Sequence, residues 1–162
     1  MTRFEPFLLD RLLDTGAVGD WSGARSSMSI EQIKDSVARD LEALLNTRCG
    51  VRRERIETYR EAARSVLTYG LIDFVGLSLD SPHDCDLICQ SIGQAISRHE
   101  PRLRSARVSL ERREHGGLGL NFHIQALLVV NPAREPVNFD AVLHPSTQQY
   151  SVHRSRRVPV GA

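Results

Sequence analysis

The sequence predicts an α+β domain in which N-terminal helices pack on a small antiparallel β-meander. Two observations carry this prediction. Apolar residues recur at helical spacing as far as His99, and beyond Pro101 they alternate with polar residues as they do in strands. With 162 residues and 41% hydrophobic content, the chain is long enough to bury one compact core. We therefore expect a single domain over residues 1–153, followed by a basic flexible tail at 154–162.

The N-terminal half is expected to open with two helices. Apolar residues form one helical stripe between Phe4 and Asp14, which glycines then interrupt. After a loop, Ser29 and Gln32 have the spacing of a capping box. The apolar repeat that follows continues to Cys49, so this second helix is the clearest in the chain.

Two further helices are expected before the strands. The first runs from Arg52 to Leu67, with its inward positions at Ile56, Tyr59, Ala63, Val66 and Leu67. The stretch "YGLIDFVGLSLDSP" at 69–82 reads as a glycine-broken loop. Ser81 and Pro82 suit the N-cap and first turn of the next helix. Its inward positions are expected to be Leu87, Ile88, Ile92 and Ile96.

This last helix should end where a proline follows a glutamate. Pro101 pushes the residue before it out of the helical conformation, so Glu100 must be extended. Positions two apart in an extended segment point the same way, so Glu100 and Arg102 should project together. Judged by its residues alone, such a pair is more often an ordinary surface or intradomain ion pair than a functional contact.

The C-terminal half is expected to form a β-meander. Alternation over residues 106–125 predicts a hairpin that turns at His115–Gly117, buries its even-numbered side chains and forms the centre of the sheet. A third strand should bury Val137, Phe139, Ala141 and Leu143, and a short fourth should run from Gln149 to Val152. Pro136 and Pro145 interrupt this region, so one C-terminal strand is expected to be a sheet edge with unpaired backbone groups.

No pattern in the chain identifies a catalytic or metal site. "HGGLG" has the G-x-x-G spacing of some phosphate or nucleic-acid loops, but here it joins two strands. Cys85 and Cys89, with His83 nearby, lack the second ligand pair of a zinc site. We expect no cofactor, no metal and no catalytic residue. A formal charge of +1 argues against nucleic-acid binding, and the sequence has no long apolar run for membrane insertion.

Four stretches of the sequence resemble the TssE family of type VI secretion baseplate proteins. These are "LLDRLLD" at 8–14, "RDLEALLNTR" at 39–48, "SVLTYGLIDF" at 65–74 and "EPRL" at 100–103. They occur in the family's order and at similar spacings, and the resemblance extends from about Leu8 to Val152. The family is related to the wedge protein of contractile phage baseplates.

The resemblance implies a structural component of the baseplate wedge. Such a protein is cytoplasmic, at the inner face of the inner membrane, which suits a chain without a disulfide pattern. It binds the wedge subunits TssF and TssG, with TssK as a further candidate partner, and initiates polymerisation of the contractile TssB/TssC sheath. We expect the sheath strand to add to the C-terminal sheet edge by β-augmentation.

The resemblance also implies which residues matter. The family's glutamate-proline-arginine motif falls on Glu100, Pro101 and Arg102, which are therefore expected to bind a partner. The family loop, whose role could be local packing, matches this chain at Tyr69, Gly70, Leu71, Asp73 and Phe74. The chain departs from the family at His99, where a phenylalanine is usual, and at Ile72, where a proline is usual.

One enzymatic alternative stays open. Relatives have been labelled lysozyme-like, which suggests a peptidoglycan hydrolase acting through a carboxylate pair. Nothing in the sequence identifies the pair, and only one tryptophan is present to stack on sugars. We expect the protein not to be an enzyme.

Overall fold

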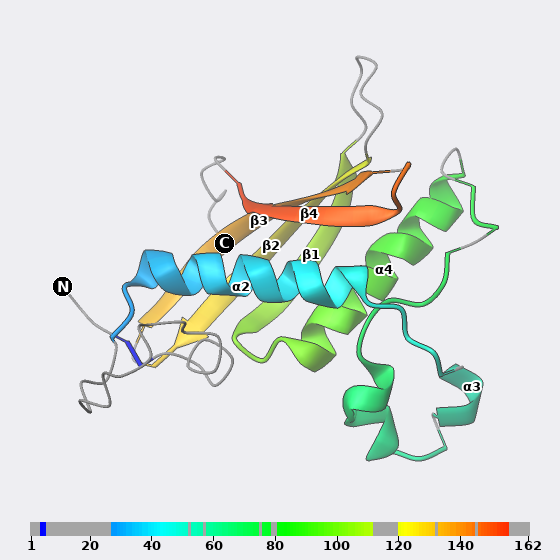
Figure 1. Ribbon diagram of the computed structural model, residues 1–162, viewed down its shortest axis with the longest axis horizontal. Coiled ribbons are helices and arrows are strands. Elements are labelled where there is room, and N and C mark those ends of the chain that lie inside the picture. Colours follow the sequence, from blue (N-terminus) through cyan, green and yellow to red (C-terminus); the bar gives the residue numbers. More distant parts are fainter. Residues whose placement is uncertain are drawn as a thin grey trace, which may run out of the picture.

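The computed structural model describes residues 4–5, 27–51, 53–56, 58–74, 76–78, 81–111, 120–131, 133–144 and 146–155. Its helices are α2 (Ile30–Asn46), α3 (Arg53–Ile56) and α4 (Pro82–His99), with short 3₁₀ turns η1 (Ala62–Arg64) and η2 (Val66–Thr68). Its strands are β1 (Leu103–Glu111), β2 (Leu120–Val130), β3 (Ala133–His144) and β4 (Gln149–Arg154). The α+β prediction is confirmed (Figure 1).

Helix α2 begins as the sequence predicts. The Gln32 backbone N–H donates to Ser29 Oγ at 3.2 Å, and the Ser29 N–H donates to Gln32 Oε1 at 2.8 Å. This reciprocal capping box satisfies two of the donors that a helix start leaves unpaired. The apolar face of α2, which includes Ile33, Val37 and Leu41, is buried in the core.

Helix α4 has the predicted ends but a different inward face. Ser81 caps it, and Glu100 follows His99 with φ −120° and ψ 84°, outside the helical region. Leu87, expected to be inward, is exposed, whereas Cys85 is buried. The buried stripe passes through Ile88, and adjacent helical residues point about 100° apart, so Leu87 falls outside the stripe.

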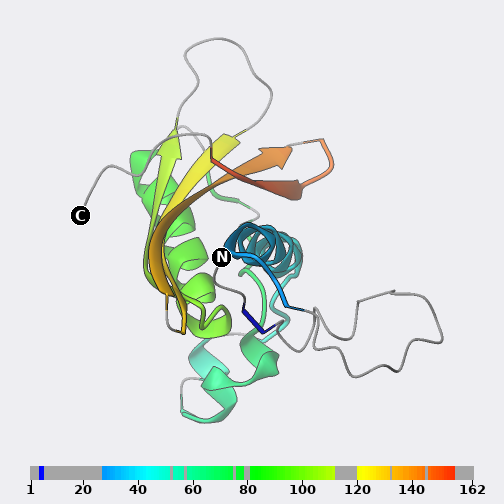
Figure 2. The same ribbon diagram turned by 90° about the vertical axis from the view of Figure 1, so that its left-hand side faces the viewer.

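The four strands form one antiparallel meander in the order β1-β2-β3-β4. The core includes side chains from one face of this sheet together with those of both long helices, because α4 packs mainly on β1 and α2 mainly on β4. Figure 2 shows α2 nearly end-on, on the concave side of the curved sheet. The other face of the sheet carries mostly polar side chains.

The predicted hairpin has the expected inward and outward positions, but it does not form the centre of the sheet. Phe122 and Ile124 are buried while Arg107 and Gln125 are exposed, as the alternation requires. However, β1 is an edge strand, and β2 and β3 form the centre. The pairing skips one residue between Arg104 and Arg107, so both parts of β1 face the core. The predicted turn at residues 115–117 lies outside the described residues.

The predicted helix from Arg52 to Leu67 is wrong. Among the described residues of this stretch, only the four of α3 are α-helical, and two 3₁₀ turns follow. Ser65 is extended, with φ −90° and ψ 178°, and its Oγ accepts the Leu67 N–H at 3.3 Å. The Ser65 side chain thus caps the second 3₁₀ turn, where the chain changes direction. Tyr59, Val66 and Leu67 are exposed instead of buried.

Strand β3 buries Val137, Phe139 and Ala141 as expected and Leu143 in part, but the expected free C-terminal edge is not found at β4. Strand β4 is an edge, yet three of its backbone groups, at Tyr150 and Val152, are already bonded to side chains of α2. Asn46 bonds both the N–H and the C=O of Tyr150 at 2.8 Å, and Glu42 Oε2 accepts the Val152 N–H at 2.8 Å. The C-terminal edge is therefore covered by helix side chains along these positions.

The two chain ends are only partly described. Phe4 and Met28 pair through backbone bonds of 2.9 and 2.8 Å, and the Phe4 side chain joins the core. The rest of the expected opening helix and the expected tail beyond residue 155 lie outside the described residues. Strand β4 extends to Arg154, whose guanidinium pairs with Glu31 and Asp35. None of the described helices is long and apolar enough to cross a membrane.

Tyr150 gives the fold a testable pH dependence. Its hydroxyl is buried without a hydrogen-bond partner among the described residues, and burial raises the pKa of Tyr150 to about 12. The unfolded chain loses this proton near pH 10 but the folded chain does not, so stability should fall between about pH 10 and 12 by about 2 to 3 kcal/mol. Urea unfolding at several pH values should show this fall, and Tyr150→Phe should reduce it. An unchanged fall in the variant would contradict the assignment.

Candidate functional site

Glu100 and Arg102 form an ion pair within residues 100–102, which connect α4 to β1 and which we call the corner. Glu100 Oε1 accepts the Arg102 backbone N–H at 3.1 Å and the Arg102 Nε–H at 2.6 Å. The second carboxylate oxygen accepts from the Arg102 Nη2 group. The guanidinium therefore meets the carboxylate through two parallel bonds, the geometry that gives such pairs both strength and fixed orientation.

A second carboxylate comes from helix α2. The Arg102 Nη2 group also donates to Asp40 Oδ2, and Nη1 reaches Ser36 Oγ at 3.4 Å. Burial alone would lower the pKa of Arg102, but the bonds and charge of Glu100, followed by those of Asp40, outweigh it. The pKa of Arg102 is therefore raised. The arginine ties α2 to the start of the sheet.

Backbone bonds hold the corner on both sides of the proline. The Glu100 N–H donates to Ile96 O at 2.8 Å, which closes the last turn of α4. The Val129 N–H donates to Arg102 O at 2.8 Å, which attaches the corner to β2. Pro101 lies between these bonds and is exposed. The corner is thus fixed in place before any partner binds.

The predicted loop lies beside this corner and connects it to the end of α2. The Leu71 N–H donates to Thr47 O and the Cys49 N–H to Leu71 O, both at 2.8 Å. Gly70 has φ +106°, and a Cβ there would lie 2.5 Å from Thr47 O, so only glycine fits. Leu71 is fully buried. In the structure, this part of the family loop packs against the end of α2.

Tyr69 brings the loop into contact with the corner. Its ring packs edge-on against the ring of His99, with centroids 5.3 Å apart. Burial, followed by the charges of Asp40 and Glu100, raises the pKa of Tyr69. His99 Nε2 lies 2.9 Å from Thr68 O, so the residue that departs from the family pattern binds the loop.

The remaining loop residues are less constrained. Phe74 is half-buried against the core, whereas Asp73 is exposed. Ile72, which stands where the family usually has a proline, is exposed at the surface. The structure therefore places Tyr69 against the corner, and Gly70 and Leu71 against Thr47 and Cys49 at the end of α2.

Sequence reasoning missed the contribution of α2. Ser36 and Asp40 are one helical turn apart and belong to the same side of α2 as Val37 and Leu41. The available signal in the sequence was a serine within the apolar stripe of this helix. The structure shows that Ser36 is fully buried. The serine pointed to a polar partner inside the domain, which is Arg102.

The three residues of the predicted motif differ in their exposure to solvent. Glu100 is 4% exposed and Arg102 is 8% exposed, so the charge pair is an intradomain contact, while Pro101 faces solvent. A partner can reach the motif directly at Pro101, and the half-buried Asp40 of α2 lies beside the motif, bonded to Arg102. Its partner-binding role stays a prediction.

The cysteines that the sequence singled out do not form a metal site with other described residues. Cys85 and Cys89 lie on α4 and are not joined by a disulfide bond. Within the described ranges, no group of three or more His, Cys, Asp or Glu side chains could hold a metal ion. The "HGGLG" segment lies outside those ranges.

Comparisons with known proteins agree with the resemblance found in the sequence. The model of the family described as baseplate wedge protein gp25 matches residues 31–133. A solved structure titled "The baseplate complex from the type VI secretion system" contains a chain with 17% sequence identity and a TM-score of 0.46. That alignment covers 69% of this chain and 94% of the other. No curated protein matches the sequence.

Removing Arg102 should unfold the domain more easily. In Arg102→Ala, Glu100 would remain buried without its partner, which commonly costs about 3 to 5 kcal/mol. For a chain of this size that lowers the melting temperature by about ten degrees or more. Calorimetry on the isolated protein measures the change, and Arg104→Ala, which removes an exposed arginine two residues away, is the matched control. Equal melting of both variants would show that the pair does not stabilise the domain.

Proposed function

Because the chain belongs to the family of the baseplate wedge protein gp25, we propose that it is a structural subunit of a type VI secretion baseplate. The family match over residues 31–133 carries this proposal, and it includes the whole corner and its loop. The type VI assignment is supported by the four TssE-like stretches, which occur in the family's order. We propose a cytoplasmic location at the inner face of the inner membrane.

A scaffold role suits the corner better than catalysis does. A glycosidase needs a carboxylic acid that can protonate the leaving oxygen and a second carboxylate across the bond. Among the described residues, Glu100 is the one buried carboxylate, and both of its oxygens accept bonds from Arg102. A group held in this way orients the backbone and cannot approach a substrate without breaking the pair.

We propose TssF and TssG as the wedge partners, with TssK as a further candidate. The fixed corner supports this because its geometry is set by buried bonds and need not form during binding. Preorganised surfaces lose less conformational entropy on association. The exposed Pro101 and the half-buried Asp40 are the parts of the corner that a wedge subunit can contact.

For sheath initiation, we propose that the incoming strand adds to β1 and not to the C-terminal edge. At β4, Asn46 and Glu42 occupy outward backbone groups. At β1, no hydrogen bond outside the β1–β2 ladder reaches the backbone of Ala106 or Val108 from any described residue. An unpaired edge is the site at which an extended segment can add.

The surroundings of β1 leave room for such a strand. Burial, followed by Asp86 and Cys85, raises the pKa of the Cys89 thiol, and the Leu110 N–H opposes this by donating to Cys89. Leu110 therefore points its N–H away from β2, and Val108, two residues earlier in the regularly paired part of the strand, shares this orientation. An open groove of about 470 Å³ lies between β1 and α4. On the α4 side its lining includes small residues, namely Cys89, Gly93 and Ser97.

The scaffold role is tested by reconstitution with the two proposed wedge subunits. The purified protein should co-elute with a TssF–TssG complex on size exclusion and should leave peptidoglycan intact. A protein that does not bind the complex would contradict the wedge role. Muropeptide release that a single Asp or Glu substitution abolishes would establish the hydrolase alternative.

The edge assignment is tested by Val108→Pro. Proline removes the outward N–H and blocks strand addition, while edge strands tolerate it. We expect wedge binding to remain and TssB/TssC sheath assembly to be lost, as seen by electron microscopy. The control is the Glu42→Ala/Asn46→Ala double variant, which uncovers β4 and should leave assembly at the wild-type level. Normal sheaths with Val108→Pro, in a variant with near-normal melting, would reject β1.

A further inference from the structure

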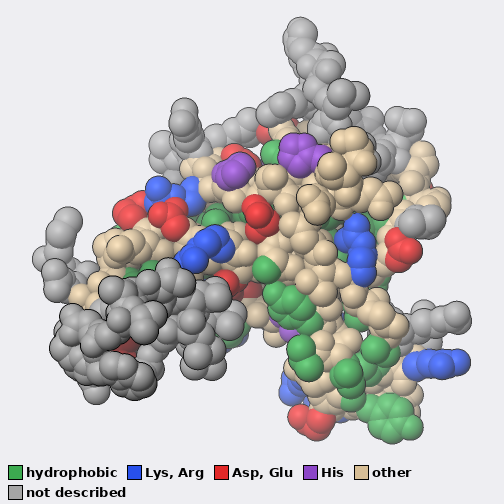
Figure 3. Space-filling view, viewed as in Figure 1, with side chains coloured by type: hydrophobic (Ala, Val, Ile, Leu, Met, Phe, Trp, Pro, Cys, Tyr) green, Lys and Arg blue, Asp and Glu red, His purple; other side chains and the backbone are tan. Residues whose placement is uncertain are grey.

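The segment that failed to form the predicted helix presents an unusual apolar surface. Tyr59, Val66, Leu67 and Ile72 are 67%, 80%, 54% and 42% exposed, and we call these four residues the apolar lobe. Among the described residues only one other large apolar side chain, Leu87, is exposed. Figure 3 shows the hydrophobic side chains gathered on the projecting part that contains α3 and the 3₁₀ turns. Such clustering marks an interaction site more often than scattered exposed residues do.

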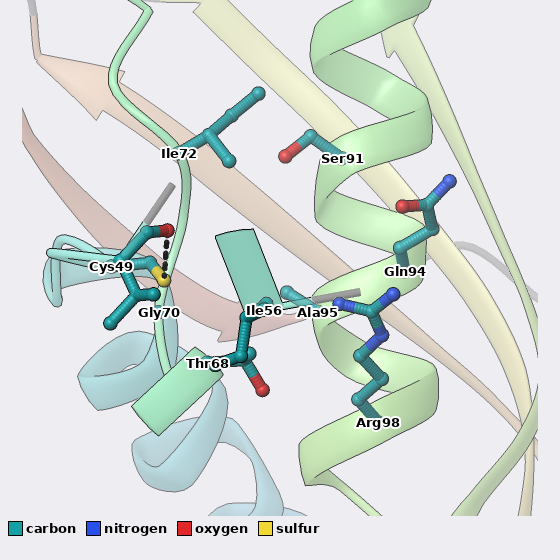
Figure 4. Close-up of a pocket in the computed structure, with 10 residues that line it drawn as sticks. Cys49, Ile56, Thr68, Gly70, Ile72, Ser91, Gln94, Ala95 and Arg98 are labelled. Carbon is teal, nitrogen blue, oxygen red and sulfur yellow. Dashed lines mark hydrogen bonds between the residues drawn. The ribbon is translucent and has the colours of Figure 1, made fainter. Parts of the chain in front are cut away.

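A small pocket opens beside the lobe. It has a volume of about 40 Å³ and lies between the loop that carries Ile72 and the C-terminal half of α4. Figure 4 shows Ile72 and Thr68 on the loop side of this pocket, and Ala95 and Arg98 on the helix side. The pocket therefore has a lining of apolar residues mixed with Thr68, Ser91 and Gln94, and Arg98 is its one cation. Its volume suits one side chain, since pockets for drug-sized ligands are about 300 to 1,000 Å³.

The charge around the lobe is predominantly positive. Exposed arginines lie at positions 55, 60, 64 and 98, whereas the described exposed carboxylates of the same segment are Glu61 and Asp73. Within the part of the chain that the structure describes, none of these four arginines forms an ion pair. Elsewhere on the molecule, Lys34 and Arg154 are paired with carboxylates. Among the described side chains of this segment, exposed cations therefore outnumber exposed carboxylates.

We propose that the apolar lobe and the adjoining pocket are a docking site for a segment of another protein that carries a bulky apolar side chain close to a carboxylate. The apolar side chain enters the pocket between Ile72 and Ala95, and the carboxylate pairs with Arg98. A few apolar and arginine contacts at the centre of a surface commonly dominate binding energy. This inference rests on the proposed function, because the segment would belong to a neighbouring wedge subunit.

Other occupants fit these observations less well. A nucleic acid would use the arginines but leaves the four apolar side chains without a role. An anionic membrane would use both, but the lobe is built from short turns instead of one long amphipathic helix. A protein segment accounts for the cations, the apolar residues and the pocket that fits a single side chain.

The test measures binding of lobe variants to a TssF–TssG complex. The variants are Val66→Ser/Leu67→Ser, which removes apolar surface, and Arg98→Glu, which reverses the charge at the pocket. Because these side chains are exposed, both variants should melt near the wild-type temperature. We expect each to bind at least tenfold more weakly by biolayer interferometry, and wild-type binding should weaken as the salt concentration is raised.

Matched controls separate the lobe from general effects of polarity and charge. Leu87→Ser changes an exposed leucine on α4, and Arg134→Glu reverses an exposed charge on β3; both should bind as the wild type does. Wild-type affinity of folded lobe variants would overturn the docking site but not the wedge role. A wild-type protein that does not bind the complex would overturn both, because the inference depends on that role.

Two further measurements distinguish the other occupants. Sedimentation with phosphatidylserine vesicles that depends on Arg98, together with unchanged wedge binding, would assign the lobe to a membrane and overturn the proposal. A concentration-dependent dimer in light scattering that the Val66→Ser/Leu67→Ser variant dissolves would assign it to a second copy of the chain. We expect the wild type to be monomeric and to remain in the supernatant.

Discussion

The position of Arg102 between Glu100 and Asp40 is the constraint on which the arrangement of the domain depends. The two carboxylates belong to different parts of the chain, one at the end of α4 and the other in the middle of α2. A guanidinium has enough donors in one plane to bind both carboxylates and still reach Ser36. Because this contact is buried, loss of any one member would leave the others as unpaired polar groups in the core and would lower the stability of the domain.

This contact also determines which sheet edge is available. Because Arg102 fixes α2 beside the start of β1, the far end of the helix lies along β4, where Glu42 and Asn46 meet the strand backbone. The helix therefore protects one edge, whereas the small side chains of α4 beside β1 leave the other edge approachable. An unprotected edge is a hazard for a free protein, and in the role proposed above it is where an extended segment would add.

Much of this fold could be predicted from the sequence where local chemistry decides the outcome. The capping box at Ser29, the stop at Pro101 and the alternation in β2 and β3 depend on residues close together in the chain. The failures depend on distant contacts. Whether Glu100 and Arg102 face solvent depends on Asp40 and Ser36, which contact Arg102 from positions 62 and 66 residues away in the chain. The segment from Arg52 to Leu67 has helical apolar spacing, but the Ser65 side chain accepts a bond from the Leu67 N–H, and none of the described elements covers Tyr59, Val66 or Leu67.

Helix α4 links the two proposed binding surfaces. Gly93 and Ser97 line the groove beside β1, whereas Ala95 and Arg98 line the pocket beside the apolar lobe, and Gln94 contributes to both. Ile92 and Ile96 are fully buried between these faces, so the helix cannot rotate to serve one partner without disrupting the core. Its C-terminal end is held by Glu100, whose position depends on Arg102. A wedge subunit on the lobe and an incoming strand on β1 would therefore have a fixed orientation relative to each other. We infer that the buried charge pair serves assembly by transmitting geometry between two surfaces that it does not itself touch.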